Sequence, residues 1–313
     1  MENTSHTTSL LLTGYKETGD LQYLYFIIIL LMYMLTVAAN TVIICVICVE
    51  SSLHEPMYMF LCSLQVNGLY GSTALCPALL VNILSDIHDI SHTACLMQIY
   101  CLHTYGICEY LTLAVMGYDR YVSICHPFHY STIMSPSRVY KLIAMTWLLP
   151  FAATTVTVIS TSQLPLCKKI IEKVYCDNYS VVKLACVDIT VNNILASFFN
   201  VVFIIPLLLL ILYSYVQILR ICLKSSAASR SKALNTCVPH LVTVINFFVA
   251  SLFELFQSRF HMEHVPLVIR VLLSVYFLIL PPLLNPIIYG LRSKKLREKT
   301  KKLLYHKLIW PIL

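Results

Sequence analysis

An acidic and a basic residue, Asp119 and Arg120, stand side by side directly after the apolar run YLTLAV at 110–115. An arginine at the end of a membrane helix is costly unless an acid neighbours it, and Asp119 supplies that acid. Such a pair is suited to act as a latch, because a released guanidinium offers hydrogen-bond donors to the backbone carbonyls of another protein. Judged on the letters DRY alone, a plain marker of the membrane border explains the pair equally well.

The sequence patterns of enzymes and zinc sites are missing from the chain. It contains no H-E-x-x-H, no G-x-S-x-G and no phosphate-binding glycine loop, and it has only 7 glycines. Its 13 cysteines form no two paired C-x-x-C sets. We therefore expect no catalysis, no cofactor and no structural metal site.

Four cysteines lie outside the apolar runs that hold most of the others. Cys95 opens the third run, while Cys167, Cys176 and Cys186 share the segment between the fourth and the fifth. If these segments face the oxidising exterior, the four cysteines form two disulfides, for which spacing alone permits three pairings.

Two tripeptides, NTS at Asn3 and NYS at Asn178, are acceptors for N-linked glycans. They are usable only if both segments face the lumen. Such tripeptides are frequent by chance, so they support this orientation modestly.

The composition indicates that these residues are carried by a membrane protein. The 313-residue chain is 58% hydrophobic and 12% charged, and its mean hydropathy is +0.76. This is more apolar surface than one aqueous core hides. A membrane-spanning helix needs about 20 apolar residues. Seven such runs occur, near 24–49, 57–84, 95–118, 140–161, 192–221, 236–257 and 267–290.

The distribution of lysine and arginine predicts how these spans are oriented. With the N-terminus outside, the inner side collects about twice as many basic residues as the outer side, and the tail RSKKLREKTKK decides the count. We expect a single seven-helix domain in the plasma membrane, comprising an extracellular segment (1–23), an all-α bundle (24–290) and a cytoplasmic tail (291–313) with a short amphipathic eighth helix. The net charge of +7 then favours anionic membrane lipid as a partner over nucleic acid.

Six motifs in the expected order make the chain resemble the odorant receptors, a family of rhodopsin-like G-protein-coupled receptors. AANTVII is similar to the first-span Gly-Asn motif, LHEPMYMFLCSL resembles LHxPMYxFL, and MGYDRYVSICHPFHY resembles MAYDRYVAICxPLxY. SYVQIL, KALNTCVPHL and PPLLNPIIYGLRSKKLR follow, the last two close to KAFSTCxSHL and PPxLNPIIYxxRxKxIR. The second-span stretch NGLYGS looks more like the fish-type, class I branch of the family.

The resemblance implies an odorant receptor that activates a heterotrimeric G protein of the olfactory stimulatory type and so raises cyclic AMP. It also implies the disulfides Cys95–Cys176 and Cys167–Cys186, which make the outer loop a lid over the cavity. By the same resemblance, the residues of activation and coupling are Asp119, Arg120, Tyr121, Tyr215, His240, Asn285, Pro286 and Tyr289. Pro286 also has a physical reason, because it breaks the helical hydrogen-bond ladder and lets the inner end of the last span bend.

Glu109 stands inside the third span, and Gly68 stands where the family has its second-span acid. The sodium cavity that the resemblance would imply therefore lacks one of its two acids. A lone carboxylate in a membrane is expensive when ionised. Three alternatives stay open for Glu109: it is protonated, it is paired with Asn67 or Asn285, or it holds a cation weakly.

Helical periodicity below Cys95 selects one wall of a ligand cavity, and apolar residues of the later spans supply the rest. The expected ligand-binding residues are Leu102, His103, Gly106, Ile107, Phe199, Phe203, Phe248, Leu252, Leu255 and Arg259. Such a lining suits a small, partly hydrophobic molecule. His103 and Arg259 could clamp an anionic head group, since a guanidinium donates two parallel hydrogen bonds to a carboxylate. The bland alternative is that Arg259 reaches into water or pairs with Glu263 and that His103 is only packed.

Two other interpretations compete with an odorant receptor. A chemosensory receptor outside olfaction is one, but its trace-amine type is disfavoured because Leu102 stands where amine receptors place an aspartate. A transporter or channel is the other, with Glu109 lining the path. Only one intramembrane acid is evident, and no internal repeat or glycine-rich broken helix occurs.

Overall fold

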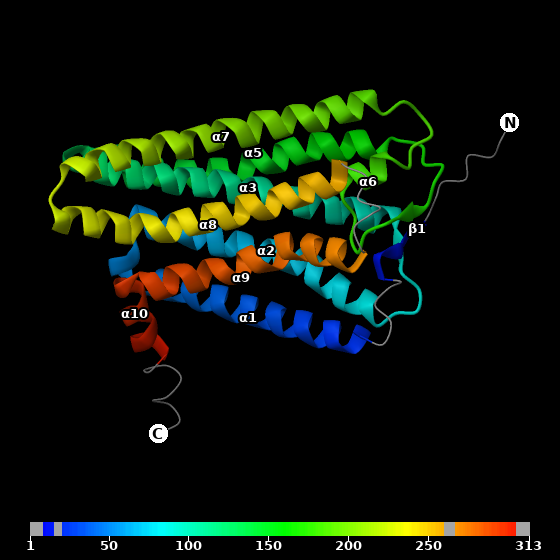
Figure 1. Cartoon of the computed structure of the whole chain (residues 1–313), viewed down its shortest axis with the longest axis horizontal. Coiled ribbons are helices and arrows are strands. Elements are labelled where there is room, and N and C mark those ends of the chain that lie inside the picture. The colour runs from blue at the N-terminus through cyan, green and yellow to red at the C-terminus, as the bar shows by residue number, and fades with distance from the viewer. Residues whose placement is uncertain (1–8, 16–20, 260–266, 305–313) are drawn as a thin grey trace, which may run out of the picture.

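Seven long helices run side by side and form one bundle, as the apolar runs predict (Figure 1). The computed structural model describes residues 9–15, 21–259 and 267–304. Each predicted run lies within one of the seven helices or extends past its end by one residue. They are α1 (Gln22–Val49), α2 (Pro56–Ile83), α3 (His92–Cys125), α5 (Pro136–Ser162), α7 (Thr190–Lys224), α8 (Ala227–Arg259) and α9 (Leu267–Arg292).

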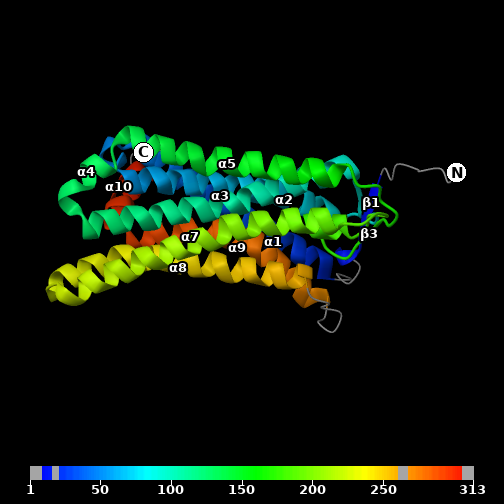
Figure 2. The same ribbon diagram turned by 90° about the horizontal axis from the view of Figure 1, so that it is seen from above.

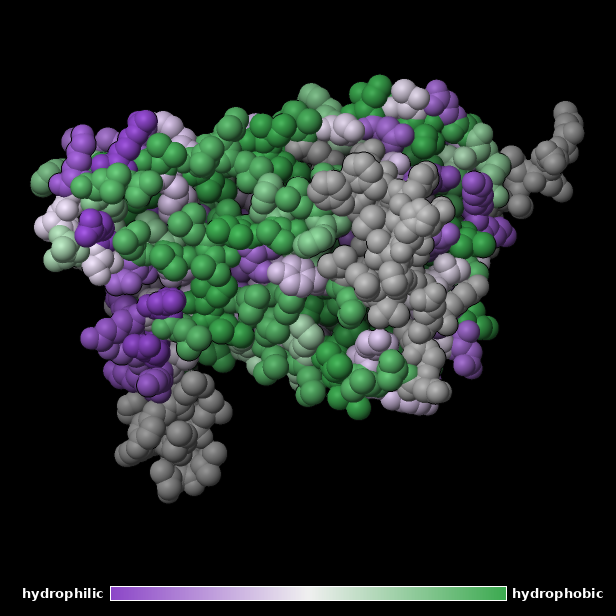
Figure 3. Space-filling view, in the orientation of Figure 1, coloured by the Kyte–Doolittle hydropathy of each residue, from purple (hydrophilic) through white to green (hydrophobic). Residues whose placement is uncertain are grey.

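The surface of the bundle is apolar between two polar ends. Six of the helices in the described part are long and apolar enough to cross a membrane; α3 is the seventh long helix. Figure 3 shows the apolar belt on one face, with hydrophilic side chains gathered toward the ends of the bundle. Large side chains such as Leu31, Leu148 and Leu212 are exposed on it, as expected of residues that face lipid.

The more polar α3 occupies the interior of the bundle. It packs against α2, α5, α7 and α8, whereas α1 packs against α2 and α9 (Figure 2). Helix α3 tolerates Glu109 and Asp119 because both carboxylates are fully buried among neighbouring helices rather than in lipid.

A short amphipathic helix, α10 (Lys294–Leu304), follows α9 and turns away from the bundle (Figure 1). Leu296 anchors it and is fully buried. Two ion pairs join it to the segment between α1 and α2: Lys295 to Glu55 at 2.6 Å and Lys299 to Glu50 at 2.7 Å. The hydrogen bond from Lys299 lowers the pKa of Glu50. The expected eighth helix is therefore present.

The opposite end of the bundle is covered by a three-stranded sheet in the order β2–β1–β3. Strand β1 (Ser9–Leu12) pairs antiparallel with β2 (Asp89–Ser91) and parallel with β3 (Ile170–Ile171). Just after β1, in the 3-10 turn Thr13–Tyr15, the Tyr15 hydroxyl donates to the Val174 carbonyl at 2.6 Å. The segment expected to be a plain extracellular tail thus contributes a strand to the cover.

Two disulfides hold the loop between α5 and α7, here called the outer loop (residues 163–189). Cys95 at the start of α3 bonds to Cys176, and Cys167 bonds to Cys186. This confirms the pairing implied by the family resemblance. The loop also contains the short helix α6 (Asn178–Val182). At the other end of the bundle, the 3-10 turns Ser51–Leu53 and Pro127–His129 and the short helix α4 (Tyr130–Ile133) form the connections.

The alternation of burial along β1 supports a stability prediction. Leu12 is 1% exposed, whereas its neighbour Leu11 is half-buried. We expect Leu12→Ala to lower the free energy of unfolding by about 2–4 kcal/mol through lost apolar burial and a cavity. Thermal unfolding of the purified protein measures this effect, with Leu11→Ala as the matched control. Equal losses from both variants would contradict the inward orientation of Leu12.

Candidate functional site

A cavity of about 260 Å³ lies beneath the outer loop, between α3, α5, α7, α8 and α9. Nine of the ten residues predicted to bind ligand line it together. They are Leu102, His103, Gly106, Ile107, Phe199, Phe203, Phe248, Leu252 and Leu255. The tenth, Arg259, ends α8, and its side chain lies outside the described residues. The α3 residues selected by the helical period and the selected residues of α7 and α8 therefore line the same cavity. Their contact with a ligand stays a prediction.

Sequence reasoning missed the lining residues from α5 and the outer loop, and one acid on α8. Thr154 and Thr157 come from α5, and Asp177 and Asn178 come from the outer loop. Glu254 comes from α8, between two residues that were selected. An acid inside the apolar run VASLFELF is a signal that could have singled it out.

The charged side chains at the outer end of the cavity form an ion triad. The Lys173 ammonium lies 2.6 Å from Glu254 Oε1 and 3.1 Å from Asp177 Oδ2. Burial lowers the pKa of Lys173, but the two carboxylates outweigh it and raise the pKa above its ordinary value. Burial raises the pKa of Asp177, yet the charge of Lys173 and a hydrogen bond from Ser180 bring it below its usual value. The triad joins the outer loop to α8.

Glu109 lies at the centre of the bundle and is fully buried. Its Oε2 accepts from Asn67 Nδ2 at 2.8 Å, and its Oε1 accepts from Asn285 Nδ2 at 2.7 Å. Among the three alternatives for this carboxylate, the structure shows pairing, and with both amides at once. The contacts join α2, α3 and α9.

The family's second acid would be crowded at Gly68. A Cβ atom there would lie 3.2 Å from Asn40 Oδ1 and 3.3 Å from Pro282 Cβ. In the described part of the chain, no group of three His, Cys, Asp or Glu side chains is arranged to hold a metal ion. A sodium ion would have only Glu109 as a carboxylate ligand, and both of its oxygens already accept amide hydrogens. The residues present do not fit a two-acid sodium site.

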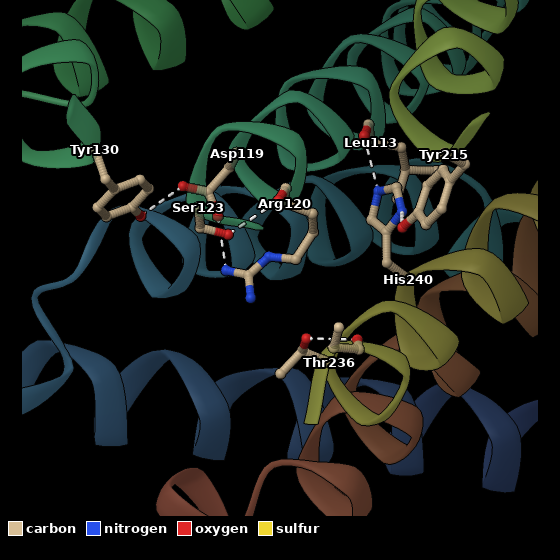
Figure 4. Close-up of polar contacts among 9 residues, drawn as sticks. Leu113, Asp119, Arg120, Ser123, Tyr130, Tyr215, Thr236 and His240 are labelled. Atoms are coloured by element: carbon tan, nitrogen blue, oxygen red, sulfur yellow. Dashed lines mark hydrogen bonds and ion pairs between the residues drawn. The ribbon is translucent and has the colours of Figure 1, made fainter. Parts of the chain in front are cut away.

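At the inner end, Asp119 is fully buried and holds two partners (Figure 4). Its Oδ2 accepts from Arg120 Nη2 at 2.6 Å, and its Oδ1 accepts from the Tyr130 hydroxyl on α4 at 2.7 Å. The side chain of Arg120 is 12% exposed. The arginine is thus held within its own helix, as the latch hypothesis requires of a closed state.

His240 on α8 joins three helices close to this pair (Figure 4). Its Nε2 lies 2.8 Å from the carbonyl of Leu113 on α3, and its Nδ1 lies 2.7 Å from the Tyr215 hydroxyl on α7. A carbonyl only accepts, so Nε2 carries the hydrogen and Nδ1 accepts from the tyrosine. Any separation of α8 from α3 must break one of these bonds.

The other residues implied for activation lie in two places. Asn285, Pro286 and Tyr289 follow one another on α9, and Tyr289 is 5% exposed. The Tyr121 hydroxyl instead lies 3.0 Å from His126 Nε2 at the end of α3, away from Asp119. These positions are compatible with the implied roles, which stay predictions.

The glycan predicted at Asn178 conflicts with the folded outer loop. Asn178 is 5% exposed, and its Oδ1 accepts from the Thr161 hydroxyl at 2.7 Å. A glycan needs an accessible side-chain amide, so this buried position does not accommodate one. Asn3 lies outside the described residues.

We expect sodium to leave the stability of the protein unchanged, because both oxygens of Glu109 are occupied. Exchanging sodium for N-methylglucamine should not move the unfolding temperature of the purified protein, since a ligand stabilises only the state that binds it. If the unfolding temperature is higher in sodium and Glu109→Gln removes the difference, this carboxylate does hold the ion.

Comparisons with known proteins agree with this geometry. The family model described as "Olfactory receptor" matches residues 29–307. Human olfactory receptor 6N1 is 35% identical over 304 residues, which are 96% of each chain, and human olfactory receptor 2G6 is 37% identical over 306 residues, 96% of this chain and 95% of that one. Mouse olfactory receptor 4B13 is 34% identical over 299 residues, 95% of this chain and 96% of its own. The crystal structure of squid rhodopsin superposes with a TM-score of 0.75 at 17% identity, covering 98% of this chain and 91% of that one.

Proposed function

Because the chain belongs to the olfactory receptor family, with the fold of rhodopsin-like G-protein-coupled receptors, we propose that its outer cavity binds a small odorant and that its inner end activates a G protein of the olfactory stimulatory type, raising cyclic AMP. The family comprises receptors, not enzymes. Its fish-type, class I branch stays a prediction for this chain.

The single observation that supports ligand binding is the cavity beneath the outer loop. Its wall combines phenylalanine and leucine side chains with a few polar groups at one end. Enclosed, mostly apolar cavities with few polar groups are where proteins bind small molecules. The disulfide Cys95–Cys176 ties the covering loop to α3, so the cover is held in place over the cavity.

Coupling is supported by the arrangement at the inner end of the bundle. Arg120 is held by Asp119, which Tyr130 also binds, and His240 bridges α8 to α3. Parting α8 from α3 would open the surface beside Arg120. The guanidinium would then offer its donors to backbone carbonyls of the G protein.

The chain is a multi-pass membrane protein, and we place its N-terminus outside the cell in the plasma membrane. Both disulfides and the outer sheet lie at one end, which suits an oxidising exterior. The basic helix α10 lies at the other end, where anionic lipid of the inner leaflet would attract it.

Transport and ion conduction are less well supported. Glu109, the acid that would line a path, has both oxygens bound by amides of α2 and α9. A chemosensory receptor outside olfaction would share this fold, and only its ligand and tissue would differ. Leu102 lines the cavity and brings no charge for an amine.

An anionic odorant was the hypothesis drawn from His103 and Arg259. His103 lines the cavity, as does Asp177. The described lining contributes two carboxylates, Asp177 and Glu254, at the same end. This part of the wall therefore opposes a carboxylate ligand, and the hypothesis depends on Arg259 alone.

The proposed function is tested by nucleotide exchange in membranes that contain the protein and the olfactory G protein. A panel of small odorants should include agonists that accelerate nucleotide exchange while the protein passes no current across the membrane. Ligand-driven current or solute uptake without any exchange would contradict the proposal in favour of a channel or transporter.

Two variants test the latch at Arg120. Arg120→Ala should abolish agonist-driven exchange while surface expression persists, because the guanidinium serves the open state and Tyr130 still donates to Asp119. Tyr130→Phe removes one hydrogen bond to Asp119, worth about 1 kcal/mol, and should raise agonist-independent exchange a few-fold. Tyr140→Phe, at an exposed position on α5, is the control. Normal signalling by surface-expressed Arg120→Ala would exclude the latch.

A further inference from the structure

Acidic side chains outnumber basic ones among the described residues at the outer end of the cavity. Asp177 and Glu254 line it, and none of the described lining residues is a lysine or an arginine. Lys173 is their shared basic partner and is 7% exposed. In the described part of the chain, the triad therefore has two carboxylates for one ammonium.

Glu254 has fewer hydrogen-bond partners than Asp177. Asp177 accepts from Lys173 and from both the backbone and the hydroxyl of Ser180, so its carboxylate is well satisfied. Glu254 Oε1 accepts from Lys173, but Glu254 Oε2 is buried and has no hydrogen-bond partner in the described part of the chain. A buried oxygen of an ionised group without a partner is costly, and a donor placed beside it relieves that cost.

A second, independent observation points to a ligand in the same cavity. Thr154 on α5 lines it and is 2% exposed, yet its Oγ1 has no hydrogen-bond partner among the described residues. Threonine hydroxyls on helices often bond to the carbonyl one turn back, as Thr155 and Thr157 do here. Thr154 departs from its neighbours, and its hydroxyl is available to a polar group of a bound molecule.

We propose that this cavity takes a small organic amine, whose ammonium donates to Glu254 Oε2 and whose apolar body packs on Phe199, Phe203 and Phe248. The inference rests on the proposed receptor function and names the ligand class for the same cavity. A cationic head restores the charge balance of the triad, and a charge-assisted hydrogen bond is stronger than a neutral one. A carboxylate would instead add a third negative charge at this end.

Glu254 lies on α8, whereas amine receptors place their acid on the third span, at the position of Leu102 in this chain. Leu102 on α3 is apolar, which argues against an amine if α3 is considered alone. Glu254 reaches the cavity from α8, and the outer loop brings Lys173 and Asp177 beside it. The negative site for an amine therefore arises from two elements distant in sequence.

The test uses purified full-length protein and matched probes that share one apolar ring: cyclohexylmethylamine, cyclohexylmethanol and cyclohexanecarboxylate. Binding is measured by the shift in unfolding temperature, and signalling by nucleotide exchange on the G protein. We expect the amine to act at about tenfold lower concentration than the alcohol, and the carboxylate to be the weakest, because one charge-assisted bond separates them.

Glu254→Gln keeps the shape of the side chain and removes its charge. It should raise the half-maximal concentration of the amine about tenfold and change that of the alcohol little. Glu172→Gln, at an exposed acid of the outer loop, is the matched control and should leave the response to the amine unchanged. The comparison of the three probes on the unmodified protein needs no variant, so it decides the proposal even if Glu254→Gln fails to fold.

Equal potencies, a preference for the carboxylate, or no binding of any probe would overturn the amine proposal. A carboxylate response lost in Arg259→Ala would establish the anionic alternative instead. Binding of the amine without nucleotide exchange would support this ligand class while contradicting the receptor function. Exchange driven only by neutral or acidic odorants would support the receptor function while contradicting the amine proposal.

Discussion

A carboxylate inside a membrane bundle is costly unless hydrogen-bond donors surround it, and neighbouring helices can supply them. The carboxylate of Glu109 accepts from the amides of Asn67 and Asn285, and this contact joins α2, α3 and α9. Asn40 on α1 donates to the carbonyl of Pro282 on α9 at 2.9 Å, which extends the same network to a fourth helix. These bonds favour one register of the helices, because a shift by one residue would leave the buried carboxyl group of Glu109 without donors.

The same constraint explains why the inner end is suited to two states. Asp119 and His240 are buried, and each makes its bonds to neighbouring elements and not to water. In the proposed coupling, opening the bundle would exchange these bonds for bonds to the G protein, so that both arrangements would satisfy the polar groups. An interior of aliphatic side chains alone would offer no such exchange.

The outer end is built differently, because it is stabilised covalently and by charge. Two disulfides and the strand β1 hold the outer loop over the cavity, and the Lys173 triad ties the loop to α8. Glu254 is both a lining residue of the cavity and a partner of the loop, so a ligand in the cavity would lie beside the contact that joins the loop to α8. The proposed amine would bind Oε2 of this carboxylate while Lys173 keeps Oε1, so the loop and the ligand would share one residue of α8.

The seven spans could be predicted from the hydrophobic runs, and the α3 part of the cavity wall from the helical period, because both are local properties of the chain. The spacing of the outer cysteines permitted three pairings, and three alternatives for Glu109 and two interpretations of Asp119 stayed open. The pairing of Glu109, the crowding at Gly68 and the burial of Asn178 became clear from the folded structure alone. The fold also brought Glu254 to Lys173, 81 residues away in the chain. These features depend on which helix faces lie opposite each other and on how a loop folds over them, and neither follows from the periodicity of any one segment.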